Sequence, residues 1–142
     1  MTVTSILKEK GNKVLTTPAG TSAADVAKLL DEHRIGAVVI TGSSGEVVGI
    51  LSERDIVSAI ARKGPEILNA PAEEIMTRKV LTCQPSDSIY EIMNAMTENR
   101  VRHLPVLVDG RLEGIISIGD VVKQRIAEIE FEASEMKKYI AG

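Results

Sequence analysis

Aromatic side chains are almost absent from this chain of 142 residues, which has no tryptophan, one phenylalanine and two tyrosines. The core must therefore be aliphatic, and stacking platforms for the bases of single-stranded nucleic acid are not expected. The net charge of −3 argues against a broad basic surface for DNA or RNA. Cys83 is the only cysteine, so no intrachain disulfide can form, and the two histidines lie in different segments, which argues against a structural zinc site.

Long apolar runs and enzyme signatures are missing as well. No stretch approaches about 18 apolar residues, so no membrane span is expected. The N-terminus lacks the basic and apolar regions of a secretory signal, so we expect a cytoplasmic protein. The chain contains neither of the common glycine-rich phosphate loops and no metalloprotease or serine-hydrolase motif. We therefore expect no catalytic activity.

What the chain does contain is an internal repeat. The segment GILSERD at 49–55 recurs 65 residues later as GIISIGD at 114–120. Further upstream, Pro18 matches Pro85 with an offset of 67. The difference of two residues falls in a turn, where a change of length costs little free energy. Two segments that match at both ends, with one change of length in a loop between them, indicate that the same supersecondary unit occurs twice.

Each copy predicts the order β-α-β-β-α, and hence an α+β fold. A short extended segment (Val14–Thr17 and Val80–Cys83) precedes an amphipathic helix, with Ser22 and Asp87 as predicted N-caps. A hairpin and a second helix follow, and Asp109-Gly110 is a strong hairpin signal. The predicted hairpin strands are 37–40, 47–51, 104–108 and 112–117. Because a repeat of about 60 residues hides its sheet poorly alone, we expect the two to pack as a pseudo-two-fold pair.

The predicted domains are residues 1–64 (first repeat with an N-terminal segment), 65–74 (linker), 75–127 (second repeat) and 128–142 (helix extension). The last helix carries apolar residues at alternating steps of four and three, which is a heptad pattern. We call this stripe the seam: Val122, Ile126, Ile129, Ala133, Met136 and Ile140. The seam predicts either packing on the N-terminal segment or a dimer contact, and both can hold.

The repeated motif places a serine and an aspartate where a strand ends and a helix begins, as Ser52/Asp55 and Ser117/Asp120. A helix N-terminus suits an anion, a serine can donate to it, and an aspartate can accept from two ribose hydroxyls. This spacing therefore suits the phosphate and sugar of a nucleotide. The same spacing is also a capping box, which needs no ligand. Both interpretations remain open on the residues alone.

Positive charge enters the two repeats at different places. Arg102 and His103 precede a predicted strand and form either a cationic pair for phosphates or a solvated junction. The first repeat has Ile35-Gly36 at the places we take as equivalent, whereas Arg54 has Gly119 as its counterpart. We therefore do not expect two equal sites.

The doubled motif, together with RHLPVLVDGRLEGIIS at 102–117 and EIMTRKVLTCQPSDSI at 74–89, resembles a tandem pair of cystathionine β-synthase (CBS) domains over roughly residues 5–127. The resemblance implies binding of AMP, ADP, ATP or NAD(H), with S-adenosylmethionine ranked lower. It implies that the motif aspartates hold ribose and that the motif serines and the basic residues lie near phosphate. The implied base-framing residues are Thr16, Thr82, Ala37 and Leu104.

The function that follows is a regulatory module without an attached enzyme. It would sense an adenosine nucleotide in a cleft between the repeats and transmit this state to an unidentified partner protein, as a homodimer. The alternative is a ligand-independent assembly protein that acts through its C-terminal helix. A third possibility, an enzyme, has no motif to support it.

Overall fold

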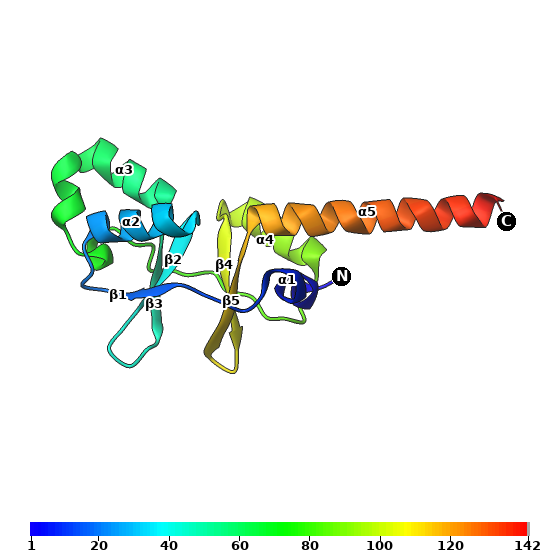
Figure 1. The fold of residues 1–142 in the computed structure, drawn as a ribbon, viewed down its shortest axis with the longest axis horizontal. Coiled ribbons are helices and arrows are strands. Elements are labelled where there is room, and N and C mark those ends of the chain that lie inside the picture. The colour runs from blue at the N-terminus through cyan, green and yellow to red at the C-terminus, as the bar shows by residue number, and fades with distance from the viewer. Residues whose placement is uncertain (142) are drawn as a thin grey trace. The chain divides into compact units, whose positions relative to one another are not determined.

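The first repeat follows the predicted β-α-β-β-α order, and the second follows it without its first strand, so the α+β fold is confirmed (Figure 1). The computed structural model describes residues 1–141. Its α-helices are α1 (Val3–Lys10), α2 (Ala23–His33), α3 (Glu53–Lys63), α4 (Ile89–Asn99) and α5 (Ile118–Ala141). Its strands are β1 (Thr16–Pro18), β2 (Ala37–Thr41), β3 (Val47–Ser52), β4 (His103–Val108) and β5 (Arg111–Ser117). Two short 3-10 helices are η1 (Pro65–Asn69) and η2 (Ala72–Glu74).

The chain divides into two compact units that do not follow the repeats in simple sequence order. Residues 14–80 form one unit, and residues 1–13 together with 81–142 form the other. The N-terminal helix α1 therefore belongs to the same unit as the second repeat. We refer to them as the 14–80 unit and the 81–142 unit.

The 14–80 unit is built on a three-stranded sheet in the order β1-β2-β3, with β1 parallel and β3 antiparallel to β2. Helix α2 turns Val26 and Leu30, one helical turn apart, onto this sheet. The segment expected as a linker folds into η1 and η2, and Ala72 is fully buried in the core. This stretch is therefore part of the unit and not a free connection.

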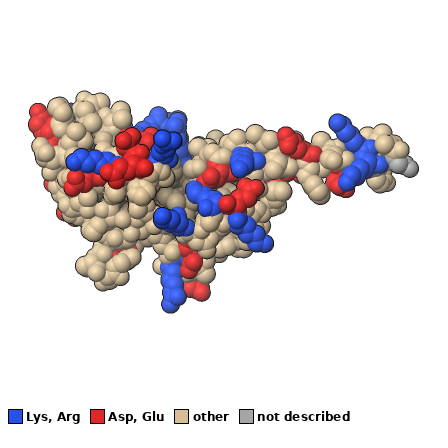
Figure 2. Space-filling model, viewed as in Figure 1, with Lys and Arg blue, Asp and Glu red and all other residues tan. Residues whose placement is uncertain are grey.

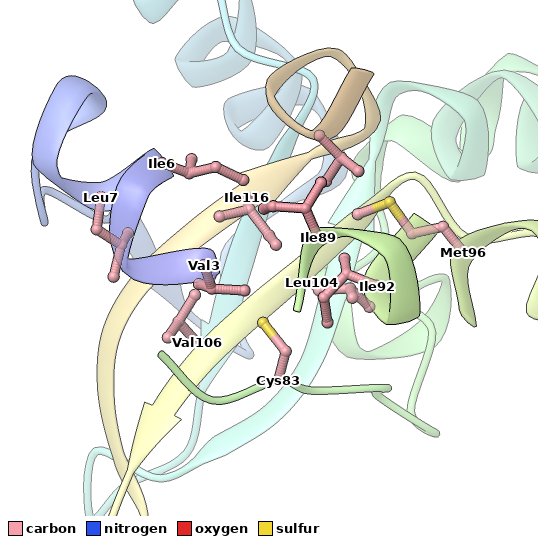
Figure 3. Packing of buried hydrophobic residues seen from close by; sticks show 11 residues of the cluster. Val3, Ile6, Leu7, Cys83, Ile89, Ile92, Met96, Leu104, Val106 and Ile116 are labelled. Atoms are coloured by element: carbon pink, nitrogen blue, oxygen red, sulfur yellow. The ribbon is translucent and has the colours of Figure 1, made fainter. Parts of the chain in front are cut away.

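The 81–142 unit is built on the β4–β5 hairpin. The turn residues Asp109 and Gly110 have φ of 51° and 78°, as a two-residue hairpin turn requires. Figure 3 shows Val3, Ile6 and Leu7 of α1 within the aliphatic core of this hairpin and α4. The last helix contributes Val121 to this core, which is not a residue of the seam. The prediction that the seam itself packs on the N-terminal segment is wrong, because Val122, Ile126 and Ile129 are exposed.

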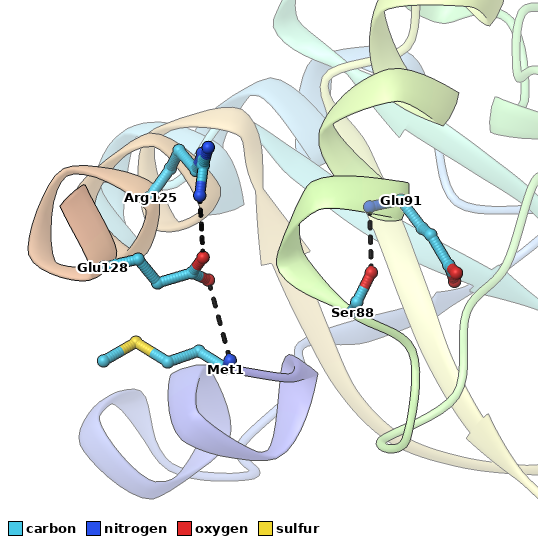
Figure 4. Close-up of polar contacts among 5 residues, drawn as sticks. All are labelled: Met1, Ser88, Glu91, Arg125 and Glu128. Atoms are coloured by element: carbon cyan, nitrogen blue, oxygen red, sulfur yellow. Dashed lines mark hydrogen bonds and ion pairs between the residues drawn. The ribbon is translucent and has the colours of Figure 1, made fainter. Parts of the chain in front are cut away.

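Two local predictions are wrong. Val80–Cys83 forms no regular strand, because only Cys83 bridges β4, through backbone bonds to Pro105 and Leu107. The N-cap of α4 is Ser88, whose Oγ accepts a hydrogen bond from the Glu91 amide at 3.0 Å (Figure 4). The expected cap, Asp87, instead accepts from the Gln84 amide at 2.8 Å and closes the preceding turn.

Helix α5 is anchored at its start and open beyond. Val121 and Gln124 are buried, and Gln124 donates to Glu9 of α1 at 3.1 Å. Figure 1 shows the rest of α5 extending away from the other elements of its unit. Over residues 1–141, no helix combines the length and the apolarity that crossing a membrane requires.

Candidate functional site

Both Ser/Asp pairs occupy the junction that the sequence predicts. Ser52 ends β3 and Asp55 lies in the first turn of α3, whereas Ser117 ends β5 and Asp120 lies in the first turn of α5. All four side chains are half-buried. Each unit therefore presents the N-terminus of a helix together with one carboxylate.

Each pair closes a capping box. The Ser52 Oγ accepts from the Asp55 amide at 3.1 Å, and Asp55 Oδ2 accepts from the Ser52 amide at 3.0 Å. The second pair repeats this at 3.2 Å and 2.9 Å. The capping interpretation is thus realised in both units. It engages a single aspartate oxygen, Oδ2, so the caps do not exhaust the accepting capacity of either carboxylate.

The two carboxylates have different neighbours. Lys10 of α1 donates to Asp120 Oδ2 at 2.7 Å, whereas Thr77 donates to Asp55 Oδ1 at 3.5 Å. Burial raises the pKa of Asp120, but the hydrogen bonds from Lys10 and Ser117 and the charge of Lys10 outweigh it, so the pKa lies below its ordinary value. Asp120 is therefore held as a carboxylate beside a cation.

Strand register brings the basic residues to the second pair. His103 lies opposite Ser117 in the β4–β5 ladder, and the Arg102 carbonyl accepts from the Ile118 amide at 2.8 Å. His103 is half-buried and Arg102 is exposed. The structure thus places Arg102 and His103 beside the start of α5.

The same bonds correct the predicted counterparts in the first repeat. Ala37 lies opposite Ser52, and the Gly36 carbonyl accepts from the Glu53 amide at 2.9 Å. Gly36 and Ala37 are therefore the equivalents of Arg102 and His103, and the predicted Ile35-Gly36 is shifted by one residue. The reason is that strand pairing, and not linear spacing, fixes which residues correspond. No basic side chain stands at this place in the first repeat. The nearest one in sequence is the exposed Arg34 at the end of α2, and the exposed Arg54 lies on α3.

The four residues implied as base-framing fall into two groups. Thr16, at the start of β1, and Thr82, next to the Cys83 bridge, are exposed. Ala37 and Leu104 are 5% and 1% exposed, and Leu104 belongs to the aliphatic core. The threonines are thus the accessible members of the set.

Sequence reasoning missed Lys10 and Thr77. Lys10 is 110 residues from Asp120, beyond the reach of any local pattern. The glycines of the motif carried a usable signal: a Cβ on Gly114 would lie 2.7 Å from Leu7, and one on Gly49 would contact Met76 and lie 3.0 Å from the Thr77 carbonyl. Each glycine therefore marks the close approach of a segment from outside its own hairpin.

Other chemistry finds little support. Burial, followed by the charge of Asp87, raises the pKa of the Cys83 thiol to about 12, so it is no nucleophile. Among the described residues 1–141, no three His, Cys, Asp or Glu side chains cluster as a metal site would need.

Comparisons with family models and with solved structures point to the same family. A family model described as "CBS domain" matches residues 6–62 and 72–126. The crystal structure of the CBS-domain containing protein ATU1752 from Agrobacterium tumefaciens is similar with a TM-score of 0.85 and 44% identity, covering 87% of this chain and 92% of that one.

Two similar structures contain adenosine compounds. The CBS domain protein PAE2072 from Pyrobaculum aerophilum, complexed with AMP, has a TM-score of 0.79 and 26% identity, covering 94% of this chain and 99% of that one. The CBS domain pair of protein MJ0100, in complex with 5′-methylthioadenosine and S-adenosyl-L-methionine, has a TM-score of 0.79 and 27% identity, covering 90% and 98%.

Proposed function

Since the chain belongs to the CBS domain family and carries two such domains in tandem, we propose that it is a non-catalytic, cytoplasmic module that senses an adenosine nucleotide and reports it to a partner protein. The observation that carries the proposal is the pair of carboxylates, each held at a helix N-terminus by its own serine. The similar proteins with bound AMP or S-adenosylmethionine support an adenosine ligand. AMP, ADP, ATP and NAD(H) are the proposed ligands, ahead of S-adenosylmethionine.

The proposed roles follow from the chemistry of each side chain. Asp55 and Asp120 accept hydrogen bonds from ribose hydroxyls, because a carboxylate can accept two at once. Ser52 and Ser117, with the amides at the helix starts, bind phosphate or ribose oxygens. The remaining proposed ligand-binding residues are Arg54, Arg102 and His103 for phosphates and Thr16, Thr82, Ala37 and Leu104 for the base.

The two half-sites are proposed to differ in affinity for phosphate. Lys10 donates to Asp120, and the backbone of Arg102 and His103 lies beside the start of α5, whereas the first repeat offers Arg54 and the hydroxyl of Thr77. More positive charge favours a ligand with more phosphate charge. We therefore expect the half-site at Asp120 to prefer ADP, ATP or NAD(H) over uncharged adenosine.

The first experiment is a thermal-shift panel with AMP, ADP, ATP, NAD+, NADH and S-adenosylmethionine, with GTP as control. A ligand at 100 times its Kd adds about 2.7 kcal/mol to the folded state, which is roughly 5–10 °C for a chain of this size. A shift with an adenosine ligand that GTP does not reproduce is the expected result. No shift in protein shown by mass spectrometry to hold no nucleotide would contradict the proposal.

Titration calorimetry on Asp55→Asn and Asp120→Asn then assigns the site. Asparagine keeps an oxygen for the cap but loses the charge, so we expect the affected site to weaken by about 1.5–3 kcal/mol. Asp25→Asn makes the same change in the first turn of α2 and serves as the matched control. If both motif variants and their double variant bind like the Asp25 variant, the ribose assignment is wrong.

A second candidate function, ligand-independent assembly, is favoured by one observation. The seam of α5 is exposed along its length, and exposed apolar stripes of this kind mark contact surfaces. Truncation after Arg125 separates the two functions. If assembly is the function, truncation abolishes the oligomer and no adenosine ligand shifts the melting temperature of either form.

A further inference from the structure

The outer surface of α5 carries a continuous apolar stripe that its own unit leaves uncovered. Val122 is 43% exposed, Ile126 51% and Ile129 50%, and exposure rises to 65% at Met136 and 80% at Ile140. These are the apolar positions of the heptad pattern, and Ala133 between them is exposed as well. The seam is therefore open from one end to the other, over about 28 Å of helix.

The seam is also turned away from the side of α5 that packs. The packing stripe contains Val121 and Gln124, which are 0% and 6% exposed. Val122 lies one residue further on, about 100° around the helix axis. A second helix can therefore approach the seam from the side, without displacing the contacts that hold α5 to α1 and α4.

The charges beside the seam are self-complementary when two copies of α5 run parallel and in register. The seam residues occupy heptad positions a and d, which puts Glu132 at g and Lys137 at the following e. In a parallel pair these positions face each other across the interface, so Glu132 of each copy meets Lys137 of the other. Arg125 and Glu130 repeat the pattern, but Arg125 is already held by Glu128 at 2.9 Å and by the Tyr90 ring at 5.7 Å.

An antiparallel pair with full overlap brings like charges together. Lys123 would then face Lys137, and Glu130 and Glu132 would each face their own copies, since e meets e and g meets g in that orientation. Sliding the antiparallel helices by one heptad removes these repulsions but leaves two of the six seam layers without a partner. Figure 2 shows that both basic and acidic side chains lie along α5.

We propose that the seam of α5 binds the seam of a second copy of this chain in a parallel, in-register, two-stranded coiled coil over residues 122–140. The six apolar layers supply the attraction, and the paired Glu132 and Lys137 select the orientation. The proposal does not depend on nucleotide binding, because the residues involved lie outside both Ser/Asp boxes.

The first test compares Met136→Ser with Phe131→Ser in the full-length chain. The two parent side chains are almost equally exposed, at 65% and 62%, but Phe131 lies at position f, opposite the seam. Sedimentation equilibrium should show a dimer dissociation constant about a hundredfold higher for Met136→Ser, because each dimer loses two apolar side chains from its interface. Phe131→Ser should dimerise like the unchanged chain, and circular dichroism should show both variants folded. A monomeric unchanged chain, or equal dissociation constants for the two variants, would overturn the proposal.

The second test exchanges charges across the interface. Glu132→Lys and Lys137→Glu should each weaken the dimer, and the double variant should restore it, because the pair is then attractive again. Lys138→Glu makes the same charge change at position f, beside Glu135 of the same helix, and should have little effect. A double variant that dimerises no better than the weaker single variant would overturn the parallel register, since only there do residues 132 and 137 meet.

Discussion

Lys10 and Asp120 form the contact that most clearly distinguishes one Ser/Asp box from the other. Their side chains are 34% and 27% exposed, so the ion pair is partly shielded from water. The net lowering of the Asp120 pKa means that the folded protein binds this proton less tightly than the unfolded chain does. The pair therefore stabilises the fold at neutral pH, and this contribution is lost as the pH falls through the lowered pKa.

Lys10→Met tests this linkage. We expect the variant to lose up to about 1 kcal/mol of unfolding free energy at pH 7, the upper range for a partly exposed pair. The difference from the unchanged chain should disappear in acid, once Asp120 is protonated in both proteins. Urea denaturation at a series of pH values, with carboxyl NMR titration of Asp120, measures both effects. Lys13→Met removes the same charge from an exposed loop residue, and an equal pKa change in that control would contradict the assignment.

Cys83 gives a second test at this scale. The side chain is 3% exposed and its pKa is raised to about 12, so thiolate is scarce at pH 8. We expect a disulfide reagent to label the folded protein far more slowly than the protein in guanidinium chloride. Equal labelling rates in the two states would show that the thiol is accessible in the fold.

Among the elements, the hairpins and their adjoining helices could be predicted because their signals are local. Asp109-Gly110 specifies its own turn, and the Ser/Asp spacing specifies its own cap. The errors arose where a distant contact decides the outcome. Ser88 and not Asp87 caps α4. Ser88 also forms a β-bridge with Thr2, which precedes the whole first repeat in the sequence. For the same reason, the serines and aspartates of the candidate site were found and Lys10 was not.

Gly49→Ala tests the close approach of the segment that follows η2. An added Cβ would contact the Met76 side chain and lie 3.0 Å from the Thr77 carbonyl, which is backbone and cannot easily give way. We expect a loss of about 1–3 kcal/mol in unfolding free energy, as for other overpacked positions. Gly20→Ala is the matched control, because a Cβ there meets nothing within 4 Å. Equal stability of the two variants in chemical denaturation would contradict the packing described for this strand.

At the scale of the whole molecule, α5 is packed against other elements at its start and exposed over the rest of its length. In its first turns Val121 and Gln124 are buried, and Arg125 pairs with Glu128 (Figure 4). Every residue from Glu130 to Ala141 is exposed. A helical stretch this short is marginal in water without packing. Its persistence therefore depends on what covers the seam.

Hydrogen exchange measures this dependence. In the monomeric Met136→Ser variant, amides of residues 131–141 should exchange much faster than those of α4. In the dimeric unchanged chain they should be protected, increasingly so at higher protein concentration. Protection that is independent of concentration, and equal in the variant, would show that α5 is stabilised within a single chain.

Because α1 belongs to the 81–142 unit, it cannot complete its packing early during synthesis on the ribosome. The 14–80 unit has all its residues once Val80 has emerged, whereas Val3, Ile6 and Leu7 share a core with Val121. Synthesis of those further 41 residues takes roughly 2–8 s at about 5–20 residues per second. Throughout that interval α1 lacks the residues that complete its core, so its apolar face stays uncovered and is open to chaperones that bind nascent chains.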